Sequence, residues 1–138
     1  MHTTKCINGD LQVGDTVVSV EDTGFVYLVG TVLKINKAGS PEHEMETANE
    51  TDDVHVEFDG ANYSEQRIRE IEAEFTDLYG EEKTFEDCGL DDVIMSPDML
   101  IRADVFTEDE MNAILESKAK AAEVCKRIIS QFTKAEGQ

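Results

Sequence analysis

A long amphipathic helical pattern in the last third of the chain restricts the fold more than any other segment does. It opens with Thr107-Glu108-Asp109-Glu110, the residue types of a capping box. Apolar residues then recur at helical spacing: Met111, Ile114, Leu115, Ala121, Ala122, Cys125, Ile128, Ile129 and Phe132. The pattern predicts one C-terminal helix over 108–132. At ~1.5 Å per residue such a helix is longer than a domain of this size, so we expect it to wrap the body or to project from it.

The part from 11 to 60 has strand character instead. Residues 13–20 are rich in β-branched side chains, and 25–36 forms a second, longer run of the same kind. At 54–58 apolar and polar residues alternate, which is typical of a half-buried strand. We expect this third strand to pair with the second. Gly30 within the second strand predicts a bend or bulge.

Between these parts lies a second helical pattern, at 64–79. Ser64 is a good N-cap, Gly80 a good stop, and the apolar positions Ile68, Ile71, Phe75 and Leu78 share one face. A single helical turn and one or two short strands are predicted over 84–105, broken at an edge by Pro97. The 138 residues therefore predict one domain, 1–138, of the α+β class. A small bent antiparallel sheet would be packed by the mid-chain helix and the long C-terminal helix.

One stretch of the strand region resembles a known fold. Val13-Gly14-Asp15-Thr16-Val17-Val18, then Gly24, then Gly30-Thr31-Val32-Leu33-Lys34-Ile35 is similar to the opening of SH3-like small barrels. In that family a "GDxV" strand leads through a glycine turn to a "GxVxxI" strand. The resemblance spans about 25 residues of this chain. It implies that the sheet could close into an SH3-like barrel instead of remaining open.

The chain is strongly acidic, and the acids are unevenly distributed. It has 31 Asp and Glu against 12 Lys and Arg, a formal net charge of −19. Residues 38–110 hold 24 of the acids and four of the bases, and the segment 37–53 reads as a long, mobile acidic loop. Such a field repels phosphate backbones and anionic membranes, and it attracts basic proteins or cations. We therefore expect a basic protein as partner, with no direct nucleic-acid contact and no membrane.

In composition the chain looks like the small acidic proteins that phages and bacterial mobile elements carry. Some of these, including many anti-CRISPR proteins, inhibit nucleic-acid enzymes by presenting carboxylates where phosphates would lie. The resemblance implies a non-enzymatic, nucleic-acid-mimicking inhibitor of a basic nucleic-acid-handling protein. The residues expected to contact that partner are carboxylates of the loop and of the 64–79 helix: Glu42, Glu44, Glu46, Asp52, Asp53, Glu70, Glu72 and Glu74.

Two other functions stay open at this stage. The first is an accessory interaction module, for example a homodimer formed through the apolar stripe of the C-terminal helix. The second is an enzyme that uses surplus carboxylates, or Cys88 beside His43 or His55. Cys88 closes a helical turn, where the helix dipole would raise its pKa, and His55 is expected on the surface of its strand.

Residue spacing predicts neither a cofactor nor a metal site. The histidines and cysteines lack CxxC or HxxxH spacing, and no calcium-loop template is met. The three cysteines, Cys6, Cys88 and Cys125, are an odd number at wide spacing, as in proteins kept reduced. The N-terminus shows no apolar leader, and no run approaches the ~20 apolar residues of a membrane span. We expect a cytoplasmic protein.

Overall fold

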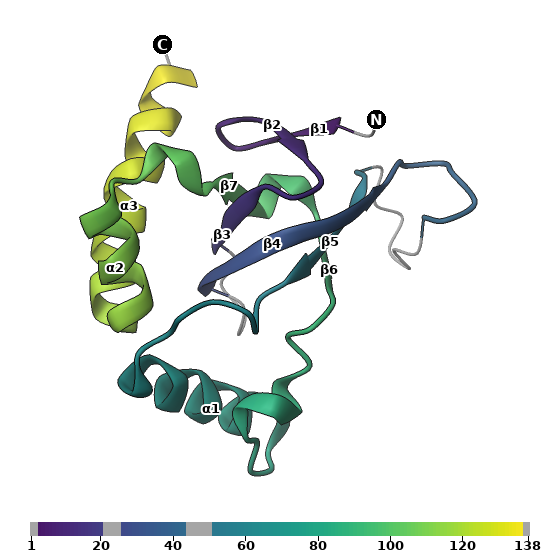
Figure 1. The fold of residues 1–138 in the computed structure, drawn as a ribbon. Coiled ribbons are helices and arrows are strands. Elements are labelled where there is room, and N and C mark those ends of the chain that lie inside the picture. The colour runs from purple at the N-terminus through teal and green to yellow at the C-terminus, as the bar shows by residue number, and fades with distance from the viewer. Residues whose placement is uncertain (1–2, 21–25, 44–50, 137–138) are drawn as a thin grey trace.

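The structure, a computed structural model, describes residues 3–20, 26–43 and 51–136. It confirms the α+β class: a five-stranded antiparallel sheet lies among three α-helices, beside a separate two-stranded hairpin (Figure 1). The sheets are not closed, so the bent open sheet is the form present. The strands are β1 Thr3–Cys6, β2 Gly9–Gln12, β3 Thr16–Val20, β4 Val26–Asn36, β5 Asp53–Glu57, β6 Val93–Met95 and β7 Leu100–Arg102. The helices are α1 Glu65–Tyr79, α2 Glu108–Glu116 and α3 Lys118–Glu136, with short 3-10 turns η1 Phe85–Cys88, η2 Pro97–Met99 and η3 Ala103–Val105.

The sheet order is β6-β5-β4-β3-β7, with β4 in the centre. The predicted pairing of the second and third strands is confirmed, since β4 and β5 are antiparallel neighbours with Val32 opposite Val56. A Cβ at Gly30 would lie 2.6 Å from Val56 Cγ1, so glycine is needed there for the close approach of β5. The irregularity in the β4–β5 register falls just after it, between Val32 and Lys34. The break at Pro97 is also as predicted, because it separates the two edge strands.

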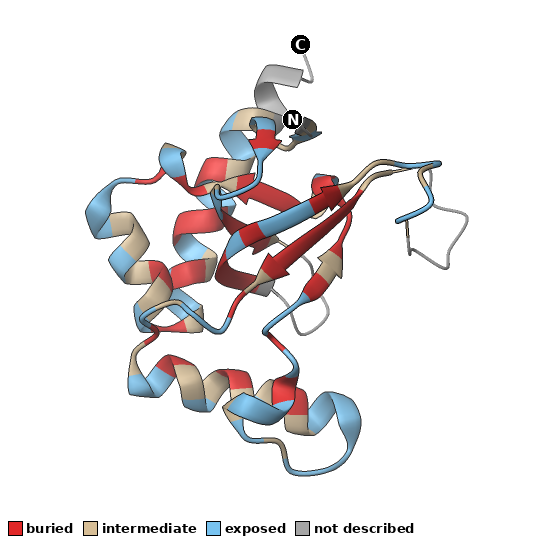
Figure 2. Ribbon diagram, turned by 45° about the vertical axis from the view of Figure 1, so that its right-hand side comes forward, coloured by how far each residue is buried: buried red, intermediate tan, exposed pale blue. Residues whose placement is uncertain are grey.

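Each face of the sheet carries its own hydrophobic core, because adjacent strand residues point to opposite sides. Val17 belongs to the core that also contains Phe58, Ile71 and Phe75, under α1. Its neighbour Val18 belongs to the core under α2 and α3. Figure 2 shows these buried faces in red, with the helices packed on either side of the sheet. Among the described residues, no helix has the length and hydropathy needed to cross a membrane.

The prediction of one continuous C-terminal helix is wrong. Ser117 has extended backbone angles (φ −158°, ψ 156°), and it separates α2 from α3. Its side-chain hydroxyl accepts a hydrogen bond from the Lys120 N–H (3.2 Å), so it caps the new helix. The chain turns, and α3 packs against α2 over the same face of the sheet. The apolar stripe is therefore used internally: Ile114, Ala121, Cys125 and Ile128 are all buried.

The N-terminal hairpin was not predicted. β1 and β2 pair through a two-residue turn at Ile7-Asn8, followed by Gly9 with a φ of 138°. The hairpin lies along the outer edge of β7, where Ile7 N–H donates to the Leu100 carbonyl (3.1 Å). Asn8 continues this contact by bonding both the N–H and the C=O of Arg102. That edge of the sheet is thus covered by the hairpin.

The mid-chain predictions are largely confirmed. α1 begins after Ser64, whose hydroxyl accepts from the Arg67 N–H, and it ends at Gly80 with a φ of 73°. The turn η1 is closed by Gly89, as expected. One helix position is wrong: Leu78 is 53% exposed, whereas Arg67 is fully buried.

Candidate functional site

The carboxylates expected along α1 are used inside the protein. Glu70 Oε1 accepts a hydrogen bond from the Lys118 N–H (2.8 Å) and so caps the first turn of α3. Glu72 Oε2 accepts from the Phe85 N–H (2.8 Å) at the start of η1, and Glu74 forms an ion pair with the Lys118 ammonium. These three side chains therefore tie α1 to its neighbouring elements.

Two of them also act electrostatically on the buried side chain of Arg67. Burial lowers the pKa of Arg67, and the nearby carboxylates of Glu74 and Glu70 act in the opposite direction. A fully buried arginine on an otherwise apolar helix face was not foreseen from the sequence. The one indication of its burial in the sequence is that Arg67 stands one helical turn before Ile71, on the packed side of the helix.

The described loop acids are also anchored, apart from Glu42. Asp52 accepts from the Lys37 ammonium (3.0 Å) and the Ala38 N–H (2.9 Å). Partial burial alone would raise the pKa of Asp52, but hydrogen bonds from Thr4, Ala38 and Lys37 outweigh it and hold that pKa below its usual value. Asp53 is fully buried, with its Oδ1 3.3 Å from His43 Nε2.

Of the remaining loop acids, Glu42 is exposed, and its carbonyl accepts from the Asn36 side-chain amide (2.9 Å). Glu44 and Glu46 lie outside the described residues. Of the six described carboxylates in the expected contact set, five thus serve the fold and only Glu42 faces solvent without a side-chain partner.

The prediction that His55 is an ordinary surface residue is wrong. His55 is 2% exposed, and its Nδ1 lies 2.8 Å from Asp92 Oδ1. Its Nε2 lies 3.4 Å from the Asn36 amide nitrogen. The alternating pattern gave a wrong prediction of exposure because both faces of β5 are covered, as the burial of Asp53 through Val56 shows.

The cysteines are poor candidates for a nucleophile. Burial, with Glu72 and Asp87 nearby, raises the pKa of Cys88, and its thiol donates to the Thr84 carbonyl (3.3 Å). Burial raises the pKa of Cys125 to about 12. The direction predicted for Cys88 is confirmed, although burial is the main cause. Both thiols keep their protons near neutral pH, the opposite of what nucleophilic catalysis requires. Within the described residues, no group of three or more His, Cys, Asp or Glu is placed to hold a metal ion.

Exposed carboxylates gather instead where α1 ends and the chain reverses into η1 and the following turn. We call this surface the acidic end; residues 77–92 contribute seven acids and a single base, Lys83. Figure 2 shows much of this stretch as exposed, at the bottom of the molecule. The acids are Asp77, Glu81, Glu82, Glu86, Asp87, Asp91 and Asp92.

Little of this charge is neutralised internally. Lys83 pairs with Glu81 (3.1 Å), and its ammonium also lies 5.2 Å from the centre of the Tyr79 ring. Asp92 contacts His55, and Asp87 closes the capping box with Thr84. The three remaining acids after α1 are exposed and form no ion pair in the described part of the chain: Glu82, Glu86 and Asp91.

Two large apolar side chains are exposed beside these acids. Leu78 is 53% exposed and Tyr79 55%, two of the four exposed large apolar residues of the described chain. Tyr79 stacks on Phe75, with ring centroids 6.0 Å apart and an interplanar angle of 19°, so its position is fixed. An apolar centre bordered by charges is the arrangement found in many protein–protein contact surfaces.

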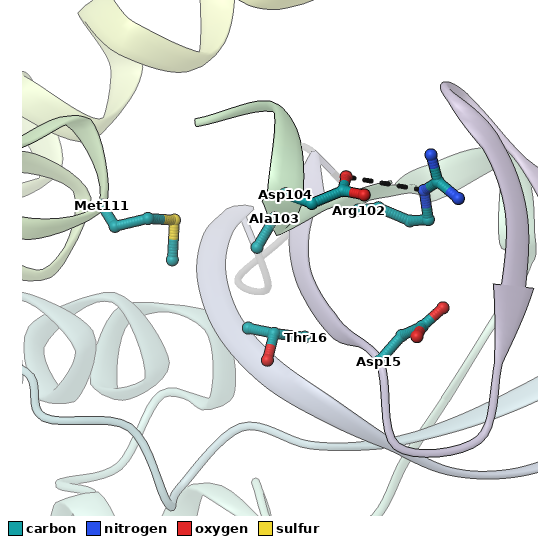
Figure 3. Close-up of a pocket in the computed structure, with 6 residues that line it drawn as sticks. All are labelled: Asp15, Thr16, Arg102, Ala103, Asp104 and Met111. Carbon is teal, nitrogen blue, oxygen red and sulfur yellow. Dashed lines mark ion pairs between the residues drawn. The ribbon is translucent and has the colours of Figure 1, made fainter. Parts of the chain in front are cut away.

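A separate pocket lies at the start of β3 and the end of β7 (Figure 3). It measures about 430 Å³ and is lined by Asp15, Thr16, Arg102, Ala103, Asp104 and Met111. The hairpin β1–β2 borders it on the Arg102 side, and α2 contributes Met111. Sequence reasoning did not identify this site, because its residues come from three separate parts of the chain.

The chain was also compared with known proteins. Neither protein-family models, nor curated proteins, nor solved structures give a match. Function is therefore inferred from the residues of the acidic end and the pocket themselves.

Proposed function

We propose that this protein is a non-enzymatic binding protein and that its acidic end receives a basic protein partner. One observation supports this above all: seven carboxylates and one lysine lie within sixteen consecutive residues at one end of the molecule. Such a concentration of one sign of charge attracts a basic surface and speeds its association. The exposed Leu78 and Tyr79 add apolar area that a partner could cover.

The local backbone supports this role because it holds the acidic end in a fixed shape. Thr84 and Asp87 form a capping box at η1. The Lys83 N–H donates to Thr76 Oγ1 (3.0 Å), and the Phe85 N–H donates to Glu72. A surface that is already ordered loses less entropy on binding, so more of its interaction energy appears as affinity.

The more specific form of the proposal is a nucleic-acid-mimicking inhibitor, similar in mode to anti-CRISPR proteins. In this form the partner handles nucleic acid, and the acidic end occupies its phosphate-binding groove. Duplex DNA carries one negative charge per ~1.7 Å of axis, so the seven carboxylates correspond to about 12 Å of duplex. The contact would then be a short one, with Glu82, Glu86 and Asp91 at its centre.

The proposal is tested with two triple variants that each remove three negative charges, at different places on the protein. One triple variant changes the acidic end, with Glu82→Gln, Glu86→Gln and Asp91→Asn. The matched control removes three exposed acids elsewhere, with Asp59→Asn, Asp98→Asn and Glu123→Gln. Binding of a fluorescein-labelled octa-arginine peptide is followed by anisotropy at low salt.

We expect the acidic-end variant to bind about tenfold more weakly, since each exposed ion pair contributes ~0.2–1 kcal/mol. The control should change affinity by about twofold at most, through the general field alone. Equal weakening in both variants would mean that only net charge matters, which would contradict the proposal. For the more specific form, the wild-type protein should compete with duplex DNA for a basic DNA-binding domain, and the acidic-end variant should compete less.

A further inference from the structure

The pocket of Figure 3 has a polar and an apolar half. Asp15, Arg102 and Asp104 form the polar half. Met111 and Ala103 supply the apolar lining, with the Thr16 hydroxyl near them, and the Met111 side chain points from α2 toward the pocket. This division matches a ligand with a polar head and an apolar stem, and it fixes the direction in which such a ligand would lie.

Arg102 is already committed to the hairpin. Its Nη1 donates to the Asp10 carbonyl (3.2 Å) and its Nη2 to the Asn8 carbonyl (3.5 Å). A Cβ at Gly9 would lie 3.2 Å from the Arg102 Cζ, so the guanidinium packs against the turn. Its Nε lies 3.6 Å from Asp104 Oδ1. The guanidinium thus forms a wall of the pocket and faces the hairpin.

The two carboxylates keep acceptor capacity. Asp15 Oδ2 accepts from the Gln12 N–H (2.9 Å), which orients the side chain. Two backbone bonds fix the same turn: the Gly14 N–H donates to the Val32 carbonyl (2.8 Å), and the Val32 N–H donates to the Asp15 carbonyl (2.9 Å). The Asp104 side chain is 66% exposed, and among the described residues its one ion pair is with Arg102. Two carboxylates against one guanidinium leave the polar half with an excess of one negative charge.

We propose that this pocket binds an organic cation, that is, an ammonium or guanidinium group on a short aliphatic stem. The cationic head lies between Asp15 and Asp104, and the stem packs on Ala103 and Met111. A volume of about 430 Å³ accommodates a stem of several carbons. The head can belong to a free amine or to a lysine or arginine side chain of another protein. The inference does not depend on the acidic end, which lies on a different part of the fold.

The test uses ¹³C-methyl methionine NMR of the full chain, with the Met111 signal assigned by Met111→Leu. Agmatine and n-butylammonium are compared with two ligands of similar stem, neutral n-butanol and anionic butyrate. We expect both cations to shift the Met111 signal to saturation, with butanol and butyrate at least about fivefold weaker. If butanol or butyrate binds as well as the cations, the proposal is overturned.

Substitutions at the pocket carboxylates test whether agmatine binds at this place. Asp104→Asn and Asp15→Asn should each weaken agmatine binding by roughly two- to fivefold, the loss expected for one exposed ion pair. Asp109→Asn, an exposed acid in the first turn of α2 that does not line the pocket, is the control and should have no effect. An equal loss in all three variants would overturn the assignment to this pocket. The preserved spectrum of each variant verifies its fold.

Two further titrations distinguish the sources of the cation. Capped tripeptides with a central arginine or lysine test a protein side chain, and agmatine tests a free amine. Saturation of Met111 by the tripeptides assigns the pocket to a side chain of a partner, and saturation by agmatine alone assigns it to a small molecule. Failure of both overturns the proposal. The acidic-end triple variant should retain agmatine binding, so failure of the proposed function would be recognised separately.

Discussion

The half-buried carboxylates of α1 and the exposed ones of the acidic end come from one continuous stretch of chain, yet they serve different purposes. Glu70 and Glu72 accept backbone N–H bonds from neighbouring elements. Glu82 and Glu86, a few residues further on, are exposed and have no partner in the described chain. A count of acids in the sequence treats both groups alike, but only the second is available to a partner.

The largest effect is expected at Glu70, which caps α3 and also compensates the buried charge of Arg67. Glu70→Ala removes both roles and should lower the free energy of unfolding by about 3 kcal/mol. Glu70→Gln keeps an oxygen for the Lys118 N–H but loses the charge, so the difference between the two variants separates the roles. Urea denaturation measures both. If Glu70→Ala lowered the free energy of unfolding by less than about 0.5 kcal/mol, Glu70 would contribute no more to stability than the exposed acids do.

The buried Asp53 should have the next largest effect. Asp53→Ala removes a fully buried acceptor beside His43, which should cost about 2 kcal/mol of unfolding free energy. Asp91→Asn, an exposed acid from the acidic end, is the control in the same denaturation experiment. Similar values for the two variants would remove the distinction between internal and exposed carboxylates.

A pH dependence is expected from Glu110. The Thr107 N–H and Arg127 both donate to its carboxylate, and they hold the pKa of Glu110 below its ordinary value. A lowered pKa in the folded state means that its stabilisation is complete above about pH 5 and is lost as pH falls through the folded pKa. Glu110→Gln should therefore lose less stability than wild type between about pH 5 and pH 3. Denaturation curves at several pH values test this. If wild type and Glu110→Gln lost the same unfolding free energy as the pH falls, the expectation would be contradicted.

The smallest effect on stability is expected for the acidic end. Glu82→Gln, Glu86→Gln and Asp91→Asn should each change the free energy of unfolding by no more than about 0.5 kcal/mol. The reason is that these side chains form no ion pair within the described chain. Thermal denaturation provides the measurement. A clear destabilisation by any one of them would show that it, too, belongs to the fold.

The fold class could be predicted because residues close together in the sequence determine where many of the helices and strands begin and end. The caps at Ser64, Thr84 and Thr107 and the stop at Gly80 follow from hydrogen bonds within a few residues, and all of them are present. The break at Ser117 could also have been found. Serine is a good N-cap, and the apolar stripe is interrupted between Leu115 and Ala121. The hairpin had a signal as well, the turn residues Asn8-Gly9.

The candidate sites could be predicted only in part, because tertiary contacts decide which polar groups remain exposed. No local pattern shows that Glu70 reaches the N-terminus of α3, 48 residues away. His55 obeys a half-buried strand pattern, but the polar groups of Asn36 and Asp92 cover it. The density of acids over 77–92 can be counted in the sequence. The sequence does not show which of these carboxylates remain exposed once the chain reverses after α1.

The division between internal and exposed carboxylates is tested most directly by backbone amide NMR during titration with the octa-arginine peptide. Signals are followed for the whole described chain at low salt. We predict that the perturbed amides cluster in residues 77–92 and that those around Glu70, Glu72 and Asp53 remain unchanged. Perturbations centred on the 37–53 loop, or spread evenly over the surface, would contradict the assignment of the acidic end as the contact surface.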